Sequence, residues 1–168
     1  MVEYFKQIVT GQFEAALCML NACVEACPEE HWEGKIAKGS FRWVVYHTLF
    51  FTDLYLSPSE EAFALRELHS RGGDERGEEA CVGLGKEDTL AYVQICRQKA
   101  IETIAGETRQ TLEGPSGFSY RKCSRGELHF YNIRHVQHHT GQMSAYLRRI
   151  EGLITDRRAL PWVGSGWR

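Results

Sequence analysis

Apolar residues recur at helical spacing along most of this chain, and this periodicity limits the folds that it can adopt. Near the start they lie three or four positions apart, at Phe5, Val9, Phe13, Leu17, Leu20 and Val24. This spacing puts them on one face and predicts a helix over 2–26 that ends before Pro28. A second helix is predicted over 41–56 with Ser40 as its N-cap, because about sixteen residues exceed the length of an average strand.

Two more helical patterns follow in the second half of the chain. One spans 86–107, with Asp88 as its expected cap. The other runs from about 128 to 151, with Gly152 just beyond its C-terminal end. Between the second and third helices lies a long connection, 57–86, so these two helices need not be antiparallel neighbours.

Four amphipathic helices without a credible strand predict an all-α protein. The expected architecture is a four-helix bundle with a long crossover between helices two and three. A chain of 168 residues can bury a single core, so one domain over 1–168 is expected. Residues 108–127 are interpreted as a loop over one end of the bundle. The tail holds Trp162 and Trp167, which either cover an edge of the core or contact a partner subunit.

Composition and charge argue against several classes of protein. The net charge of −2 leaves no basic footprint, which disfavours a nucleic-acid partner. No segment has the apolar run of a signal peptide or of a membrane-spanning helix, so we expect a cytoplasmic protein without membrane contact. The six cysteines form no C-x-x-C pair. Cys18, Cys23 and Cys27 are therefore expected to pack in the core rather than to bind metal.

Three histidines stand close together in the segment NIRHVQHHTGQM, residues 132–143. At about 100° per residue, His139 lies roughly 40° from His135, so the two straddle the middle of the predicted inward stripe of the fourth helix. His138 falls at the margin of that stripe and is expected to reach solvent or to support the other two. The i,i+4 spacing lets two imidazoles of one helix bind one ion.

A third imidazole comes from the second helix. By the same arithmetic His47 lies at the centre of an apolar face, between Phe51 and Trp43. Three histidines that share one interior suit a mononuclear ion, zinc or nickel, with a coordination position left open for catalysis. Two alternatives stay open: an ion that only braces the bundle, and a metal-free cluster whose histidines satisfy one another's hydrogen bonds.

The remaining polar residues give weaker predictions. Gln142, Asn132 and Tyr46 are candidates for orienting the ligands or contacting a substrate, with ordinary polar packing as the alternative. Four other residues are expected to face solvent: His31, His69, His129 and Asp53.

These features resemble the DinB/YfiT-like family of metalloenzymes. The second-helix segment FRWVVYHTLFFTDLYL carries an inward histidine, and HVQHHTGQMSAYLRR in the fourth helix is similar to the family pattern H-x-x-H-H-x-G-Q. The resemblance implies a four-helix bundle with a long crossover and a divalent metal held by three histidines, which carry over onto His47, His135 and His139. It also implies a homodimer.

Related members of that family are thiol-dependent transferases or isomerases that use bacillithiol, mycothiol or glutathione. This chain departs from the family pattern at Thr140, where a basic residue is common. Arg121, Lys122 and Arg134 could supply positive charge from nearby.

The absence of an obvious acidic base beside the ligands favours thiolate chemistry over hydrolysis, since a thiolate needs no separate base. We therefore expect a metal-dependent, thiol-dependent S-transferase that acts on a small-molecule substrate. The alternatives are a metal-dependent hydrolase and a non-catalytic, stress-associated metal-binding dimer.

Overall fold

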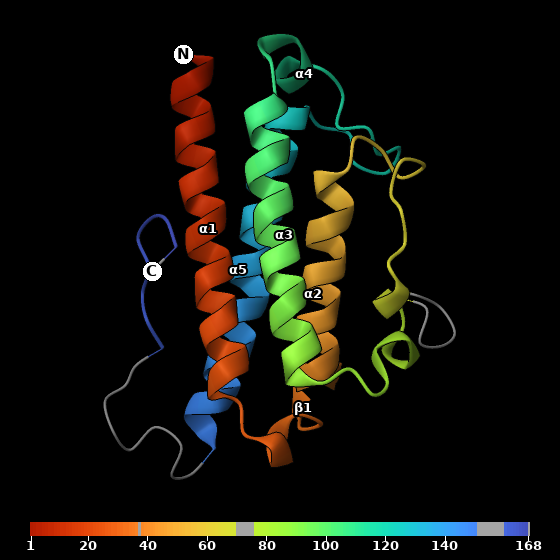
Figure 1. Cartoon of the computed structure of the whole chain (residues 1–168), viewed down its shortest axis with the longest axis vertical. Helices are drawn as coiled ribbons and strands as arrows, with labels where there is room; N and C mark the ends of the chain where they lie inside the picture. Colours follow the sequence, from red (N-terminus) through yellow and green to blue (C-terminus); the bar gives the residue numbers. More distant parts are fainter. Residues whose placement is uncertain (37, 70–75, 151–159, 168) are drawn as a thin grey trace.

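The structure, a computed structural model, describes residues 1–36, 38–69, 76–150 and 160–167 and is mostly helical (Figure 1). Within these ranges the long helices are α1 (Val2–Ala26), α2 (Phe41–Leu56), α3 (Lys86–Gly106) and α5 (Arg125–Arg149). The predicted all-α class is thereby confirmed. In the described part of the chain, no helix is long and apolar enough to cross a membrane.

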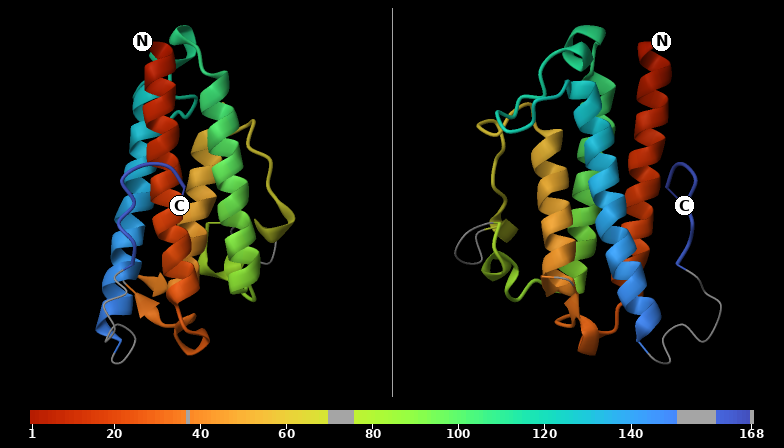
Figure 2. Two further views of the ribbon diagram at one scale, coloured as in Figure 1. Left: turned by 60° about the vertical axis from the view of Figure 1, so that its left-hand side comes forward. Right: turned by 180° about the vertical axis from the view of Figure 1, so that it is seen from behind.

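The long helices lie side by side in two pairs that run in opposite directions (Figure 1 and Figure 2). α1 and α5 run one way, and α2 and α3 run the other. Both α1 and α2 pack against α3 and α5, so α1 and α2 occupy opposite corners of the arrangement. The described parts of the connection between α2 and α3 lie along the outside of α2. The long connection therefore allows α2 and α3 to be parallel neighbours.

A short hairpin precedes α2, although no strand had been expected. Strands β1 (Lys35–Ile36) and β2 (Gly39–Ser40) pair antiparallel, with Ile36 opposite Gly39. Two residues per strand are too few to show an alternating pattern in the sequence. Ser40 then caps α2 as predicted, since its hydroxyl accepts the backbone N–H of Trp43 at 3.2 Å. A side chain on Gly39 would collide with the Trp43 ring, so this glycine allows the tryptophan to pack over the hairpin.

α5 starts at Arg125, before the predicted start near 128, because a capping box closes the preceding loop. The Ser124 hydroxyl accepts the backbone N–H of Glu127 at 3.2 Å, and the Glu127 carboxylate accepts that of Ser124 at 2.9 Å. The helix is described as far as Arg149, and its predicted end at Gly152 lies outside the described residues.

Two further boundaries differ from the sequence predictions. The N-cap of α3 is Gly85, and Asp88 lies in the first turn, where a carboxylate is favoured by the helix dipole. Part of the expected loop 108–127 forms the short helix α4 (Arg109–Glu113), which Thr108 caps. A helix of this length shows too little periodicity to be distinguished from a turn in the sequence.

Asp53 is fully buried, contrary to the expectation that it faces out. Its carboxylate accepts hydrogen bonds from Arg66 Nε at 2.6 Å, Lys99 Nζ at 2.5 Å and the Tyr92 hydroxyl at 3.1 Å. Burial alone would raise the pKa of Asp53, but the hydrogen bonds and charges of Arg66 and Lys99 lower it. The connection after α2 brings Arg66, and α3 brings the other two partners, so distant segments cover this face of α2.

Two histidines that were expected on the surface are buried. Nε2 of His69 lies 2.8 Å from the Tyr92 hydroxyl. Nε2 of His129 lies 2.8 Å from a carboxylate oxygen of Glu107. In both cases the partner belongs to another element, which the local sequence does not reveal. The third histidine of this group, His31, is half-buried.

The cysteines of α1 behave as core residues. Cys18, Cys23 and Cys27 are buried, as predicted. Burial raises the pKa of the Cys23 and Cys27 thiols to about 12. They therefore stay protonated at neutral pH, and a protonated thiol is a poor metal ligand.

The C-terminal segment 160–167 lies beside α1 (Figure 2). The backbone N–H of Gly166 donates to the Gly11 carbonyl at 2.9 Å. The guanidinium carbon of Arg97 lies 4.7 Å from a ring centre of Trp167, so this tryptophan covers an edge of the helices. Trp162, by contrast, is 82 % exposed.

Candidate metal centre

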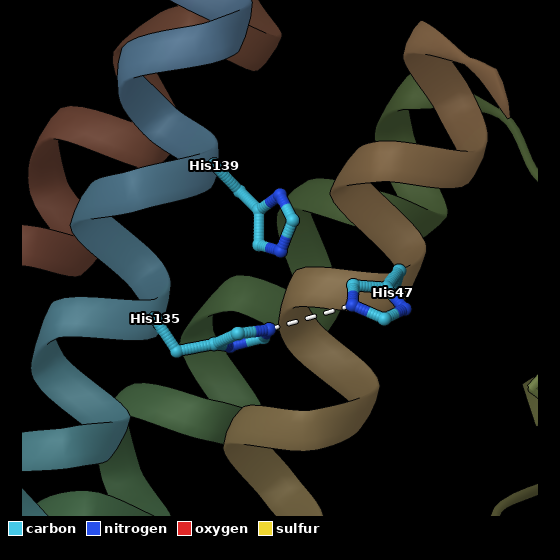
Figure 3. Close-up of side chains that lie close together, drawn as sticks. All are labelled: His47, His135 and His139. Atoms are coloured by element: carbon cyan, nitrogen blue, oxygen red, sulfur yellow. Dashed lines mark hydrogen bonds between the residues drawn. The ribbon is translucent and has the colours of Figure 1, made fainter. Parts of the chain in front are cut away.

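Three imidazoles from two helices converge where α2 packs against α5 (Figure 3). His47 comes from α2, and His135 and His139 lie about one turn apart on α5. Nε2 of His135 is 3.4 Å from Nε2 of His47. One ring nitrogen of each of the three residues lies within 4.8 Å of the others. The structure thus brings together the three histidines that the sequence had singled out.

Arg125 fixes the register of the two helices that carry the histidines. It is buried, and its guanidinium donates to the carbonyls at the end of α2, those of Tyr55, Leu56 and Ser57, at 2.8–3.0 Å. These carbonyls have no partner within a helix, and a cation near a helix C-terminus is favourable. The start of α5 is thereby tied to the end of α2. Because the two helices are antiparallel, His135 and His47 come level, each roughly 14–15 Å from this contact.

The histidines lie at the edge of the buried face rather than at its centre. On α5 the buried apolar and polar residues include Leu128, Asn132, Val136, Thr140, Met143 and Leu147. This face centres roughly 100° from His135. On α2, the half-buried residues Trp43, His47 and Phe51 form one stripe. The predicted inward stripe of α5 was therefore wrong by about a quarter turn, since apolar character does not distinguish the core from the wall of a site.

Burial and aromatic neighbours keep the three imidazoles neutral. The ring centres of Phe51 and Trp43 lie 4.7 and 5.1 Å from that of His47. Burial, with the charge of His139, lowers the pKa of His47 to about 4. Burial and then the neighbouring imidazoles lower the pKa of His135 to about 3, and burial lowers the pKa of His139 as well. At neutral pH each ring therefore keeps a lone pair for a metal ion.

Gln142 orients His139. Its Oε1 lies 2.8 Å from Nδ1 of His139, so Nδ1 carries the proton and the other ring nitrogen faces His47 and His135 (Figure 3). The Gln142 amide nitrogen also lies 3.3 Å from Nε2 of His138. His138 itself is exposed and stands outside the cluster. Of the residues proposed to support the ligands, Gln142 therefore has the contact that this role requires.

Asn132 and Tyr46 lie away from the three histidines. Asn132 is buried, and its amide donates to the Thr52 carbonyl at 3.1 Å, which links α5 to α2 within the core. Tyr46 is buried, and its ring packs against Phe50 and His69 on the side of α2 that faces the crossover. Ordinary polar packing accounts for these contacts of both residues.

The donor set suits a divalent ion of the zinc type. Metal–nitrogen distances of about 2.0–2.1 Å in a tetrahedron separate the ligands by roughly 3.4 Å. The Nε2 atoms of His47 and His135 have this separation, 3.4 Å. Among the described residues no cysteine, aspartate or glutamate joins the group, so a centre held by these histidines would have an open coordination position.

A metal-free cluster, the alternative raised by the sequence, would need to satisfy its own hydrogen bonds. It does so only in part, because the Nε2 atoms of His47 and His135 lie 3.4 Å apart and can share one hydrogen bond at most, which leaves the ring nitrogen that His139 directs at them outside that bond. A divalent ion would accept a lone pair from all three rings at once. The geometry therefore fits a metal centre better than a self-contained polar cluster.

Comparison with known families identifies the family of the chain that carries these three histidines. The DinB superfamily matches residues 12–143, a range that covers most of the chain and contains all three histidines. The chain belongs to the DinB superfamily. Comparisons with the curated proteins and with the solved structures found no match. The three-histidine group of this DinB superfamily protein fits metal binding.

Sequence reasoning missed two features of this DinB-like site. Arg125 was assigned to a loop, although the Ser-x-x-Glu pattern of 124–127 is a signal for the start of a helix. The guanidinium of Arg121 stacks on the ring of Tyr131, with 4.4 Å from its central carbon to the ring centre. No spacing in the sequence indicates that second contact.

Proposed function

We propose that this protein is a metal-dependent enzyme whose single divalent ion, zinc or nickel, is held by His47, His135 and His139. The observation that carries the proposal is the 3.4 Å approach of two neutral imidazoles from different helices, with a third beside them. The long helices form the one-domain four-helix bundle with a crossover that the family resemblance implies. The substrate is a small molecule and the assembly a homodimer, as the same resemblance implies.

Thiol-dependent S-transfer is the reaction that the surroundings favour. A divalent ion bound here supplies Lewis acidity, which lowers the pKa of a thiol or a water that it binds. No carboxylate among the described residues stands beside the histidines, and that of Asp53 is engaged by Arg66 and Lys99. A thiol that coordinates a metal ion is deprotonated outright, whereas metal-bound water has a pKa of about 7 and hydrolysis commonly uses a base as well.

The residues of the chain hold and shield the reacting groups. Gln142 accepts the Nδ1–H of His139 and fixes that ring. Trp43 and Phe51 flank His47 and exclude water from that side. In the net reaction the thiol loses its proton to solvent, its sulfur forms a bond to an electrophilic carbon, and the leaving group departs with the electron pair of the broken bond.

Turnover of a small electrophile tests the proposal. Zinc- and nickel-loaded protein would be assayed with 1-chloro-2,4-dinitrobenzene and, in turn, glutathione, bacillithiol and mycothiol. Metal-free protein and His139→Ala are the controls. We expect thioether formation that depends on the metal and on one of the thiols. Metal-dependent ester or amide hydrolysis without a thiol would instead identify a hydrolase, and bound metal with neither activity would identify an ion that only braces the helices.

A further inference from the structure

Arg121 is held near the candidate metal centre by aromatic residues. Its Nε and Nη2 donate to the Tyr55 hydroxyl at 3.2 and 2.8 Å, and its guanidinium carbon lies 4.4 Å from the Tyr131 ring centre. The loop that carries it is seated on the end of α2, because Gly117 has a φ of +88° and a side chain there would collide with the Pro58 carbonyl. The position of this arginine is therefore set by both α2 and α5.

A continuous row of aromatic rings leads from Arg121 to the histidines. Tyr131 precedes His135 by four residues, about one turn of α5 and a rise of about 6 Å. On α2, Tyr55 follows Phe51 by one turn, and their ring centres are 5.7 Å apart. The Phe51 ring in turn lies 4.7 Å from that of His47 and 5.9 Å from that of His135. The guanidinium thus lies at one end of the contact between α2 and α5, and the three imidazoles lie further along the same contact.

The charge of Arg121 is not neutralised by its neighbours. Within the described residues no carboxylate forms an ion pair with it. Burial raises the pKa of Tyr55 to about 12 against the effect of the Arg121 hydrogen bond, so the phenol is neutral at pH 7.

We propose that Arg121 selects the substrate by binding a carboxylate of the thiol whose sulfur reacts at the three-histidine centre. This inference rests on the proposed function and names the class of thiol that the site takes. A guanidinium presents paired N–H donors that match a carboxylate, and Nη1 of Arg121 is not used in its hydrogen bonds to Tyr55. The thiol must be extended, because at least one helical turn separates its two ends.

The two other cations that the sequence suggested do not share this placement. Lys122 and Arg134 are both exposed. Arg121 is half-buried, and it lines, together with Lys122, an open hollow of about 610 Å³ beside its loop, so a solute can reach it. What sets Arg121 apart is its contact with Tyr55 and Tyr131. Lys122 follows Arg121 in the same loop, which makes it a matched control for the loss of one positive charge.

Titration of the cobalt(II)-loaded protein with two matched series of thiols tests the proposal. One series runs from mercaptoacetate to 6-mercaptohexanoate, and the other consists of the corresponding mercapto-alcohols. Thiolate-to-cobalt charge-transfer absorption reports binding of the sulfur. We expect the longer carboxylates to bind about tenfold or more tightly than the matching alcohols. Arg121→Gln should abolish this preference with little effect on the alcohols, and Lys122→Gln should retain it.

The outcomes separate this inference from the function on which it rests. Two results overturn the role of Arg121 and leave the metal centre standing. In one, the charge-transfer band shows the same carboxylate preference in Arg121→Gln as in the parent. In the other, the band appears but neither protein prefers the carboxylates. Absence of the band with every thiol overturns both. Cobalt stoichiometry and helical circular dichroism of Arg121→Gln show whether the variant is folded, and Arg121→Lys should recover part of the preference, because it restores the charge without the paired donors.

Discussion

His47 and His135 face each other where two antiparallel helices meet, with their Nε2 atoms 3.4 Å apart although the residues are 88 positions apart in the sequence. Burial holds both pKa values far below the ordinary range, so neither ring is protonated at neutral pH. Two neutral imidazoles at this separation can share one hydrogen bond at most. A divalent ion would instead accept a lone pair from each, and from His139 as well.

Removal of a ligand should remove the metal. Protein purified without a His-tag should contain about one zinc or nickel ion per chain, because three imidazoles provide the protein ligands of a mononuclear site. His47→Ala and His139→Ala should contain almost none. His138→Ala is the matched control, since this exposed neighbour lies outside the cluster and its loss should leave the metal in place. Elemental analysis checks the result, and unchanged metal in either ligand variant would refute the ligand set.

Loss of the Gln142 amide should weaken the metal centre without destroying it. Gln142→Leu removes the acceptor that fixes the His139 ring, and loss of such a supporting contact costs about 10–100-fold in metal affinity. Competition with a chromophoric chelator measures that affinity. Gln137→Leu is the control on the same helix, because the Gln137 amide contacts Met19 on α1, at 3.7 Å, and no histidine. Equal losses in the two variants would contradict the orienting role of Gln142.

The identity of the clustered histidines could be predicted from the sequence, whereas their surroundings could not. Spacing alone relates His135 to His139, and a histidine among apolar residues marks His47. Their exact exposure depends on which helix faces are covered, and rings such as Phe51 look the same in a sequence whether they fill a core or line a site. The predicted centre of the α5 stripe was wrong for that reason.

The fold was predictable to the extent that it follows from local signals. The bounds of α2 agree with the prediction because Ser40 caps it, and the start of α5 was misplaced because the capping pattern at Ser124 was overlooked. The burial of Asp53 and His129 depends on partners from other elements, such as Arg66 and Glu107. Single-sequence periodicity carries no information on those pairings.

Acid should destabilise the metal-free protein between about pH 6.5 and pH 5. The pKa values of His47 and His135 in the folded chain are about 4 and about 3, below the ordinary value of 6.5. As the pH falls below 6.5, the unfolded chain takes up protons that the folded cluster does not, so the free energy of unfolding decreases. Glu107 and Asp53 also have lowered pKa values, but they reduce the free energy of unfolding only at lower pH. The unfolded chain begins to take up protons at these two carboxylates near their ordinary pKa values of 4.5 and 3.8.

Urea unfolding of the metal-free protein at both ends of this range measures the effect. His135→Leu should make the unfolding midpoint less dependent on pH, since one of the three imidazoles with a lowered pKa is removed. The zinc-loaded protein should resist the same change, because an ion bound only by the folded state adds to its stability. A midpoint of the metal-free parent that is the same at pH 6.5 and pH 5 would show that the imidazoles are protonated in the folded chain as readily as in the unfolded one.

Asp53 should matter for the fold and not for the metal. Asp53→Asn leaves the cations of Arg66 and Lys99 without their carboxylate, and breaking a buried pair costs about 3–5 kcal/mol. Because the two cations are 34 % and 26 % exposed, water can solvate them in part, and we expect a loss near 3 kcal/mol in the free energy of unfolding.

Glu60→Gln is the control for Asp53→Asn, since Glu60 and its partner Arg76 are 38 % and 44 % exposed and such a pair contributes less than about 1 kcal/mol. Urea denaturation compares the two variants with the parent. Metal content should be unchanged in both, because Asp53 lies roughly 120° around α2 from His47 and faces the crossover. A small effect of Asp53→Asn on the free energy of unfolding would mean that the two cations do not depend on this carboxylate. Loss of metal would mean that the covered face of α2 and the candidate metal centre are coupled.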